Sequence, residues 1–74
     1  MGNKKLPRDL SGQDVAKALQ RLGFAIVRQR GSHIRLENGP RHVTVPNHGE
    51  VNVRTLSSIL DQAGVTIDEL LEEL

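Results

Sequence analysis

Arg28-Gln29-Arg30-Gly31-Ser32-His33-Ile34-Arg35 lies near the middle of a chain of 74 residues and combines three arginines with a histidine. The stretch predicts the end of one strand, a tight turn and the start of the next strand. Gly31 and Ser32 suit a two-residue turn, because glycine in the first turn position accepts a positive φ without a Cβ clash. A hairpin needs a turn and an apolar face but does not need this much charge, so we expect residues 28–35 to contain functional residues.

The two-residue turn predicts which side chains face each other across the hairpin. Arg28 is expected opposite Arg35, and Arg30 opposite His33. Side chains directly opposite in an antiparallel pair lie on the same face of the sheet. One face of the sheet is therefore expected to collect three arginines and one histidine.

A second hairpin is expected directly after the first. Ile34 and Leu36 alternate with polar residues, which predicts a strand with one buried face, and residues 41–45 alternate in the same way before Pro46 closes that strand. Asn38-Gly39 is a strong signal for a two-residue hairpin turn. That turn predicts three cross-strand pairs: Ile34 with Val43, His33 with Thr44, and Arg35 with His42.

Helical patterns flank the strands. Residues 12–22 carry an apolar stripe at helical spacing, with Ser11 as an N-cap before it and Gly23 as a C-terminal stop. A second stripe runs from Val53 to Gly64. The pattern Thr66-x-x-Glu69 is a capping box and begins a short third helix.

The order of these elements defines the fold class. We predict an α+β domain with the order α-β-β-β-α, a three-stranded antiparallel sheet, helices on one face and a short extra C-terminal helix. Residues 1–74 are expected to form a single domain, with the polar residues 1–9 as a flexible arm.

Charge is distributed unevenly along the chain, although the formal net charge is only +1. Residues 1–54 contain all 10 Lys and Arg, whereas residues 55–74 contain acids and no base. The basic part of the chain, residues 1–54, suggests a polyanionic partner. Two ordinary solvated faces of opposite charge would give the same distribution of charged residues.

Several classes of protein are disfavoured. The chain has no cysteine, which excludes disulfides and thiolate chemistry and fits the cytoplasm. The first residues lack the apolar run of a signal peptide, and no stretch reaches transmembrane length, so no membrane partner is expected.

His33 is the main candidate for catalysis. A histidine can take up or release a proton near neutral pH, and guanidinium groups bind phosphate and offset transition-state charge. His33 within a group of arginines is therefore a workable set for RNA cleavage, although a surface histidine without a role fits the same pattern. The candidate RNA-binding residues are Arg28, Arg30, Arg35, Lys17 and Arg41.

Other chemistry has little support. His42 and His48 lack a converging third ligand, so neither a metal nor another cofactor is expected. Ser32 is assigned to the turn, because adjacent residues point apart and cannot form a catalytic pair with His33. Phe24, the one aromatic residue, is assigned to the core, so RNA binding should depend on phosphate contacts and weaken with salt.

Five motifs occur in a characteristic order along the chain. They are Ser11-Gly12, Leu22-Gly23-Phe24, Arg30-Gly31-Ser32-His33, Val43-Thr44-Val45-Pro46 and the segment from Thr55 to Gly64. Together they resemble the HicA toxins of HicA–HicB toxin–antitoxin modules, and the resemblance extends from about Leu10 to Leu74.

The resemblance implies a double-stranded-RNA-binding-domain-like fold and a metal-independent endoribonuclease that cleaves messenger RNA. It also implies neutralisation by a HicB-like antitoxin protein that covers the active-site region. The catalytic histidine of the family corresponds to His33. The Gly-Ser before it corresponds to Gly31 and Ser32, which position the turn.

Two other functions are compatible with the residues. A double-stranded-RNA-binding module without catalysis would use the same basic part of the chain. A protein-interaction domain would dock a partner on the apolar side of the last helix, although such stripes more often pack in a core. The residues of that stripe are Ile67, Leu70, Leu71 and Leu74.

Overall fold

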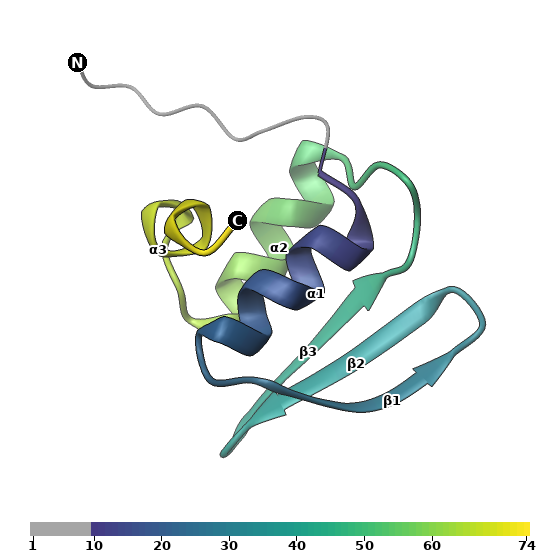
Figure 1. Cartoon of the computed structure of the whole chain (residues 1–74), viewed down its shortest axis with the longest axis horizontal. Helices are drawn as coiled ribbons and strands as arrows, with labels where there is room; N and C mark the ends of the chain where they lie inside the picture. Colours follow the sequence, from purple (N-terminus) through teal and green to yellow (C-terminus); the bar gives the residue numbers. More distant parts are fainter. Residues whose placement is uncertain (1–9) are drawn as a thin grey trace.

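The structure is a computed structural model that describes residues 10–74. The expected flexible arm, residues 1–9, lies outside the described residues. The predicted α+β order, including the short last helix, is confirmed (Figure 1). The elements are α1 (Gly12–Arg21), β1 (Ala25–Arg30), β2 (His33–Asn38), β3 (Arg41–Pro46), α2 (Val53–Ala63) and α3 (Ile67–Glu72).

The helices and the sheet form two layers. The three strands follow the order β1-β2-β3, and each is antiparallel to its neighbour. The helices lie on one side of the sheet, and no element within residues 10–74 covers the other side (Figure 1). The apolar residues between the layers form one core, whose largest fully buried side chains are Leu19, Ile34, Leu36, Leu56, Ile59 and Leu70.

Both ends of α1 are set by the residues that the sequence indicates. Ser11 Oγ accepts a hydrogen bond from the N–H of Asp14 at 3.0 Å, and the Asp14 carboxylate accepts one from the N–H of Ser11 at 3.2 Å, which forms a capping box. At the C-terminal end, Gly23 adopts a φ of +105° and the N–H of Phe24 donates to the carbonyl of Leu19 at 3.0 Å. This Schellman-type end turns the chain from α1 into β1.

The last helix packs mainly inside the domain. Its N-cap Thr66 and Glu69 form the predicted capping box. Leu70 is fully buried and Ile67 packs against the core, whereas Leu74 is 47% exposed. Two of the four residues of the apolar stripe therefore serve the core of this chain, whereas Leu71 is half-buried and Leu74 is exposed.

The first hairpin has the predicted turn and register. Gly31 adopts a φ of +57°, and the turn leaves Arg30 opposite His33 and Arg28 opposite Arg35. Glycine in the first turn position is the arrangement of a type II′ turn, whose twist matches that of the flanking strands.

A β-bulge interrupts β1 just before these pairs. Ile26 lies opposite Leu36 and Arg28 lies opposite Arg35, so Val27 is an extra residue without a partner. Ile26 therefore lies on the same side of the sheet as the fully buried Leu36, although it is itself 39% exposed, while Arg28 shares the open face with Arg35. The first residues of β1 are apolar on both faces, and the bulge determines on which side of the sheet each of them lies.

The predicted register of the second hairpin is wrong by two residues. Asn38 pairs with Arg41, so the two turn residues are Gly39 and Pro40 rather than Asn38 and Gly39. Gly39 has a φ of +61°, and proline fits the second turn position because its ring fixes a negative φ.

The shift changes the partners but keeps every side chain on its expected face, because two residues are one full period of a strand. The pairs expected from the Asn38-Gly39 turn are not formed. The observed pairs are His33 with Pro46, Ile34 with Val45, Arg35 with Thr44, and Glu37 with His42.

Candidate functional site

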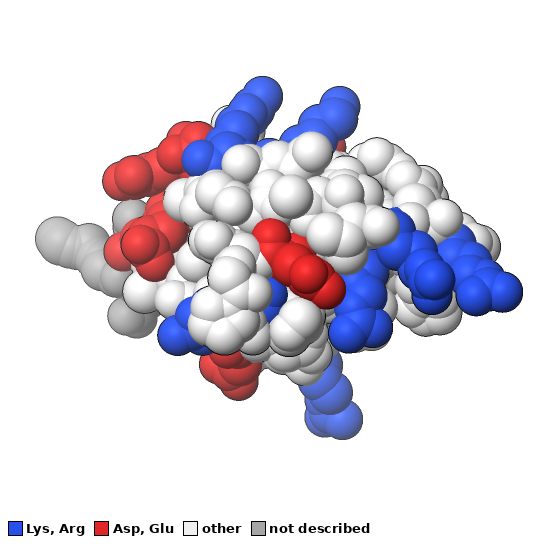
Figure 2. Space-filling model, turned by 90° about the horizontal axis from the view of Figure 1, so that it is seen from below, with Lys and Arg blue, Asp and Glu red and all other residues white. Residues whose placement is uncertain are grey.

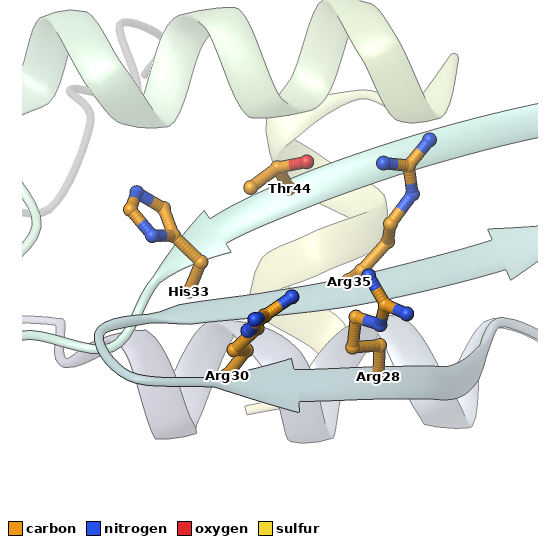
Figure 3. Close-up of a pocket in the computed structure, with 5 residues that line it drawn as sticks. All are labelled: Arg28, Arg30, His33, Arg35 and Thr44. Atoms are coloured by element: carbon orange, nitrogen blue, oxygen red, sulfur yellow. The ribbon is translucent and has the colours of Figure 1, made fainter.

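A hollow of about 270 Å³ lies on the open face of the sheet (Figure 3). Ile34 is fully buried, and its neighbours His33 and Arg35 point to the open face because successive side chains of a strand alternate. All three strands contribute to the hollow. The lining residues are Arg28 and Arg30 from β1, His33 and Arg35 from β2, and Thr44 from β3.

The pairing of the strands arranges these side chains in two rows that cross the sheet. The histidine row contains Arg30 opposite His33. The arginine row contains Arg28 opposite Arg35, with Thr44 on the other side of Arg35. The predicted meeting of the three arginines and His33 on one face is therefore observed.

The cations of the hollow are exposed and lack neutralising carboxylates. Within residues 10–74, no hydrogen bond or ion pair engages the side chains of the three arginines. The next acid along β2 is Glu37, and its Oε2 lies 3.1 Å from Nδ1 of His42. Positive potential therefore accumulates in the hollow, which suits a phosphate group.

Backbone contacts fix the turn that carries His33. The N–H of Asn47 donates to the carbonyl of Ser32 at 2.6 Å, which ties this turn to the end of β3. The side chain of Asn47 accepts a hydrogen bond from Gln13 Nε2 of α1 at 3.0 Å. Gly31 and Ser32 thus form the turn directly before His33, and a backbone hydrogen bond ties this turn to the end of β3.

Thr44 is a lining residue that the sequence does not identify. The expected register placed it opposite His33, whereas it lies opposite Arg35. Its N–H donates to Gln62 Oε1 of α2 at 3.3 Å, which holds this part of the edge strand β3. The alternation of β3 indicates the face of Thr44, but only the turn determines its partner.

Two of the predicted RNA contacts lie outside the hollow. Lys17 is on α1 and lines a different hollow beside α3, with Arg21 and Glu73 among its neighbours. Arg41 begins β3 at the far end of the hairpin from His33, and its guanidinium lies next to Gly64 at the C-terminus of α2. A cation in that position complements the helix dipole.

The remaining histidines do not join the hollow. His42 contacts Glu37 and has a side chain 51% exposed, and His48 is exposed in the loop after β3. Over residues 10–74, the structure contains no group of three or more His, Cys, Asp or Glu side chains that could hold a metal ion. No helix within that range is long and apolar enough to cross a membrane.

The uneven charge of the sequence is also visible in space. Figure 2 shows acidic side chains gathered at the left of the view, the side on which Figure 1 places α3. Basic side chains extend from the right, and others stand along the upper edge and at the lower left, while further acidic side chains lie near the centre and at the bottom. Acidic side chains are thus concentrated on the side of α3, whereas basic side chains are spread over more of the surface.

The hollow can perform two chemical tasks. Its guanidinium groups can hold the oxygens of a phosphate and offset added negative charge. His33 supplies one group able to exchange a proton with a bound ligand. Arg30 lies directly across from it, so a phosphate held by Arg30 would be within reach of the imidazole.

The chain is similar to a known family of proteins. A family model described as the HicA toxin of bacterial toxin–antitoxin systems matches residues 12–65, which extend from the start of α1 to just beyond α2. The match includes every residue that lines the hollow. A comparison with curated proteins finds no match.

Proposed function

The chain belongs to the HicA toxin family of bacterial toxin–antitoxin systems, and from this membership we propose that it is an endoribonuclease that cleaves messenger RNA, with His33 as its catalytic residue. The observation that carries the proposal is the position of His33. It lies directly across from Arg30, in a hollow that residues 10–74 line with two further arginines and no carboxylate.

In the proposed reaction His33 exchanges one proton with the RNA. Acting as a base, it removes the proton of a 2′-hydroxyl, and the 2′-oxygen then forms a bond to phosphorus while the bond to the 5′-oxygen breaks. Water supplies the proton for the leaving 5′-oxygen. Arg30, directly across from His33, holds the nonbridging oxygens and offsets the negative charge that develops on them.

Membership of the family implies a cognate antitoxin. We propose a HicB-like antitoxin that covers the hollow, because a protein seated there would block His33 and replace RNA phosphates with its own acidic side chains. We place the reaction in the cytoplasm, where messenger RNA is translated. No cofactor is required in this scheme, since His33 supplies proton transfer and Arg30 supplies positive charge.

The test is cleavage of a long RNA in the presence of excess chelator. Wild-type protein is compared with His33→Ala and with His42→Ala, a matched loss of an exposed histidine outside the hollow. We expect wild type and His42→Ala to cleave and to leave a 2′,3′-cyclic phosphate, and His33→Ala to be slower by about 10²–10⁴-fold. Undiminished cleavage by folded His33→Ala would overturn the assignment.

A double-stranded-RNA-binding module without catalysis is the second candidate, because the uncompensated arginines would bind RNA equally well. It predicts that all three proteins bind RNA, that binding weakens with salt, and that none produces fragments. The same assay therefore separates the two functions.

A further inference from the structure

The two rows of the hollow are separated by a regular distance. Arg28 and Arg30 are two residues apart on β1, as are His33 and Arg35 on β2. Two residues of an antiparallel strand span about 6.8 Å. That distance is comparable to the step between neighbouring phosphates of an extended RNA strand, and it runs along the strands.

The proposed reaction uses only the histidine row. One phosphate beside His33 and Arg30 is sufficient for cleavage, which leaves Arg28 and Arg35 without a role in the bond-breaking step. These two arginines lie directly opposite each other, and like charges in that position destabilise a sheet. No carboxylate in residues 10–74 pairs with either of them, and a bound anion would relieve their repulsion.

We propose that the arginine row is a second phosphate subsite, which binds the phosphate next to the scissile one in single-stranded RNA. This inference rests on the proposed function and adds the substrate class. Arg28 and Arg35 hold the nonbridging oxygens, and Thr44 contributes a hydroxyl from the other side of Arg35. One continuous hollow spans both rows, so a single RNA strand fills it along the strand direction.

The arrangement selects single strands and consecutive phosphates rather than bases. Attack by a 2′-oxygen requires it to be in line with the leaving 5′-oxygen, and the regular conformation of a duplex holds it out of line. Phe24 is buried in the core, and the whole sequence has no other Phe, Tyr or Trp on which a base could stack. A dinucleoside monophosphate has only one phosphate and would leave the arginine row empty, so it should be a poor substrate.

The test uses a short oligonucleotide with one ribonucleotide, which fixes the scissile bond, and deoxynucleotides elsewhere. A neutral methylphosphonate replaces the phosphate on one side of the scissile bond or the other. For wild type, we expect the replacement on one side to lower kcat/KM by about 10–100-fold, the effect of losing a charge-assisted contact. Replacement on the other side should have a much smaller effect.

Variants connect this effect to the arginine row. Arg35→Gln should lower kcat/KM for the unmodified oligonucleotide and should show little further loss with the methylphosphonate. Arg54→Gln removes the same charge from an exposed position outside the hollow, and it should keep the full sensitivity of the wild type. Thr44→Val, which removes only the hydroxyl, should give a smaller loss of about two- to tenfold.

Thermal unfolding distinguishes a binding role of Arg35 from a structural role, because loss of a structural arginine would lower the Tm. Removing one of two opposed cations should leave the Tm of Arg35→Gln equal to or above that of wild type. Equal cleavage of all oligonucleotides by wild type would overturn the subsite and leave the ribonuclease intact. If folded wild type cleaves no unmodified RNA, the proposed function fails and the subsite fails with it.

Discussion

Adjacent residues of β2 should separate stability from catalysis. Ile34 is fully buried against the helices, and His33 beside it points into the open hollow. We predict that Ile34→Ala destabilises the domain with little effect on cleavage, and that His33→Ala slows cleavage by about 10²–10⁴-fold with little effect on stability. The contrast follows from the period of a strand, which sends neighbouring side chains to opposite faces.

The size of the stability effect follows from burial. Truncating a fully buried isoleucine to alanine costs roughly 2–5 kcal/mol, whereas a domain of 74 residues has a total stability of roughly 4–11 kcal/mol. A loss of about 3 kcal/mol lowers the Tm of a domain this small by roughly 12–24 °C. His33→Ala is a surface substitution and should change stability by no more than about 0.5 kcal/mol.

The assay is thermal unfolding by circular dichroism, combined with cleavage measured at a temperature where every variant is folded. Ile34→Ala should retain kcat/KM per folded molecule, and His33→Ala should lose it at an unchanged Tm. Equal destabilisation by the two variants, or a wild-type Tm for Ile34→Ala, would refute the assignment of the two faces.

Three further predictions concern the glycines and the charge of the hollow. Gly12→Ala should cost about 1–3 kcal/mol in chemical denaturation, because its Cβ would overlap the carbonyl oxygen of Pro46, whereas Gly49→Ala, with open space around it, should be neutral. Gly31→Ala should cost about 1–2 kcal/mol because of its φ of +57°, and Gly31→Asn should cost less in the same measurement. Binding of a non-cleavable deoxyoligonucleotide should weaken with salt, and Arg35→Gln should reduce the slope of log K against log salt by about 0.7; an unchanged slope would exclude a phosphate contact at that residue.

Much of the fold could be predicted from local signals. Ser11 and Thr66 identify helix starts because their side chains accept backbone hydrogen bonds, and Gly23 identifies a helix end because it adopts a positive φ. The Gly31-Ser32 turn gave the right partners for both arginines of β1. These features depend on a few neighbouring residues, which is why the sequence reports them well.

The second hairpin and the bulge depend on competition between nearly equivalent arrangements. Asn38-Gly39 and Gly39-Pro40 are both acceptable turns, and they place the same side chains on the same faces. The apolar pattern therefore cannot choose between them, and Thr44 was assigned the wrong partner. The sequence around Val27 gives no signal that this residue is the unpaired one in the pairing of β1 with β2.

The unpaired Val27 has a consequence for changes in chain length. Elsewhere in β1 or β2, inserting or deleting one residue would turn part of a strand over and send cations toward the core. Deleting Val27 would instead leave a regular strand in which Ile26 still faces Leu36 and Arg28 still faces Arg35. This position can therefore absorb a one-residue deletion between α1 and the hollow without changing the two rows of side chains.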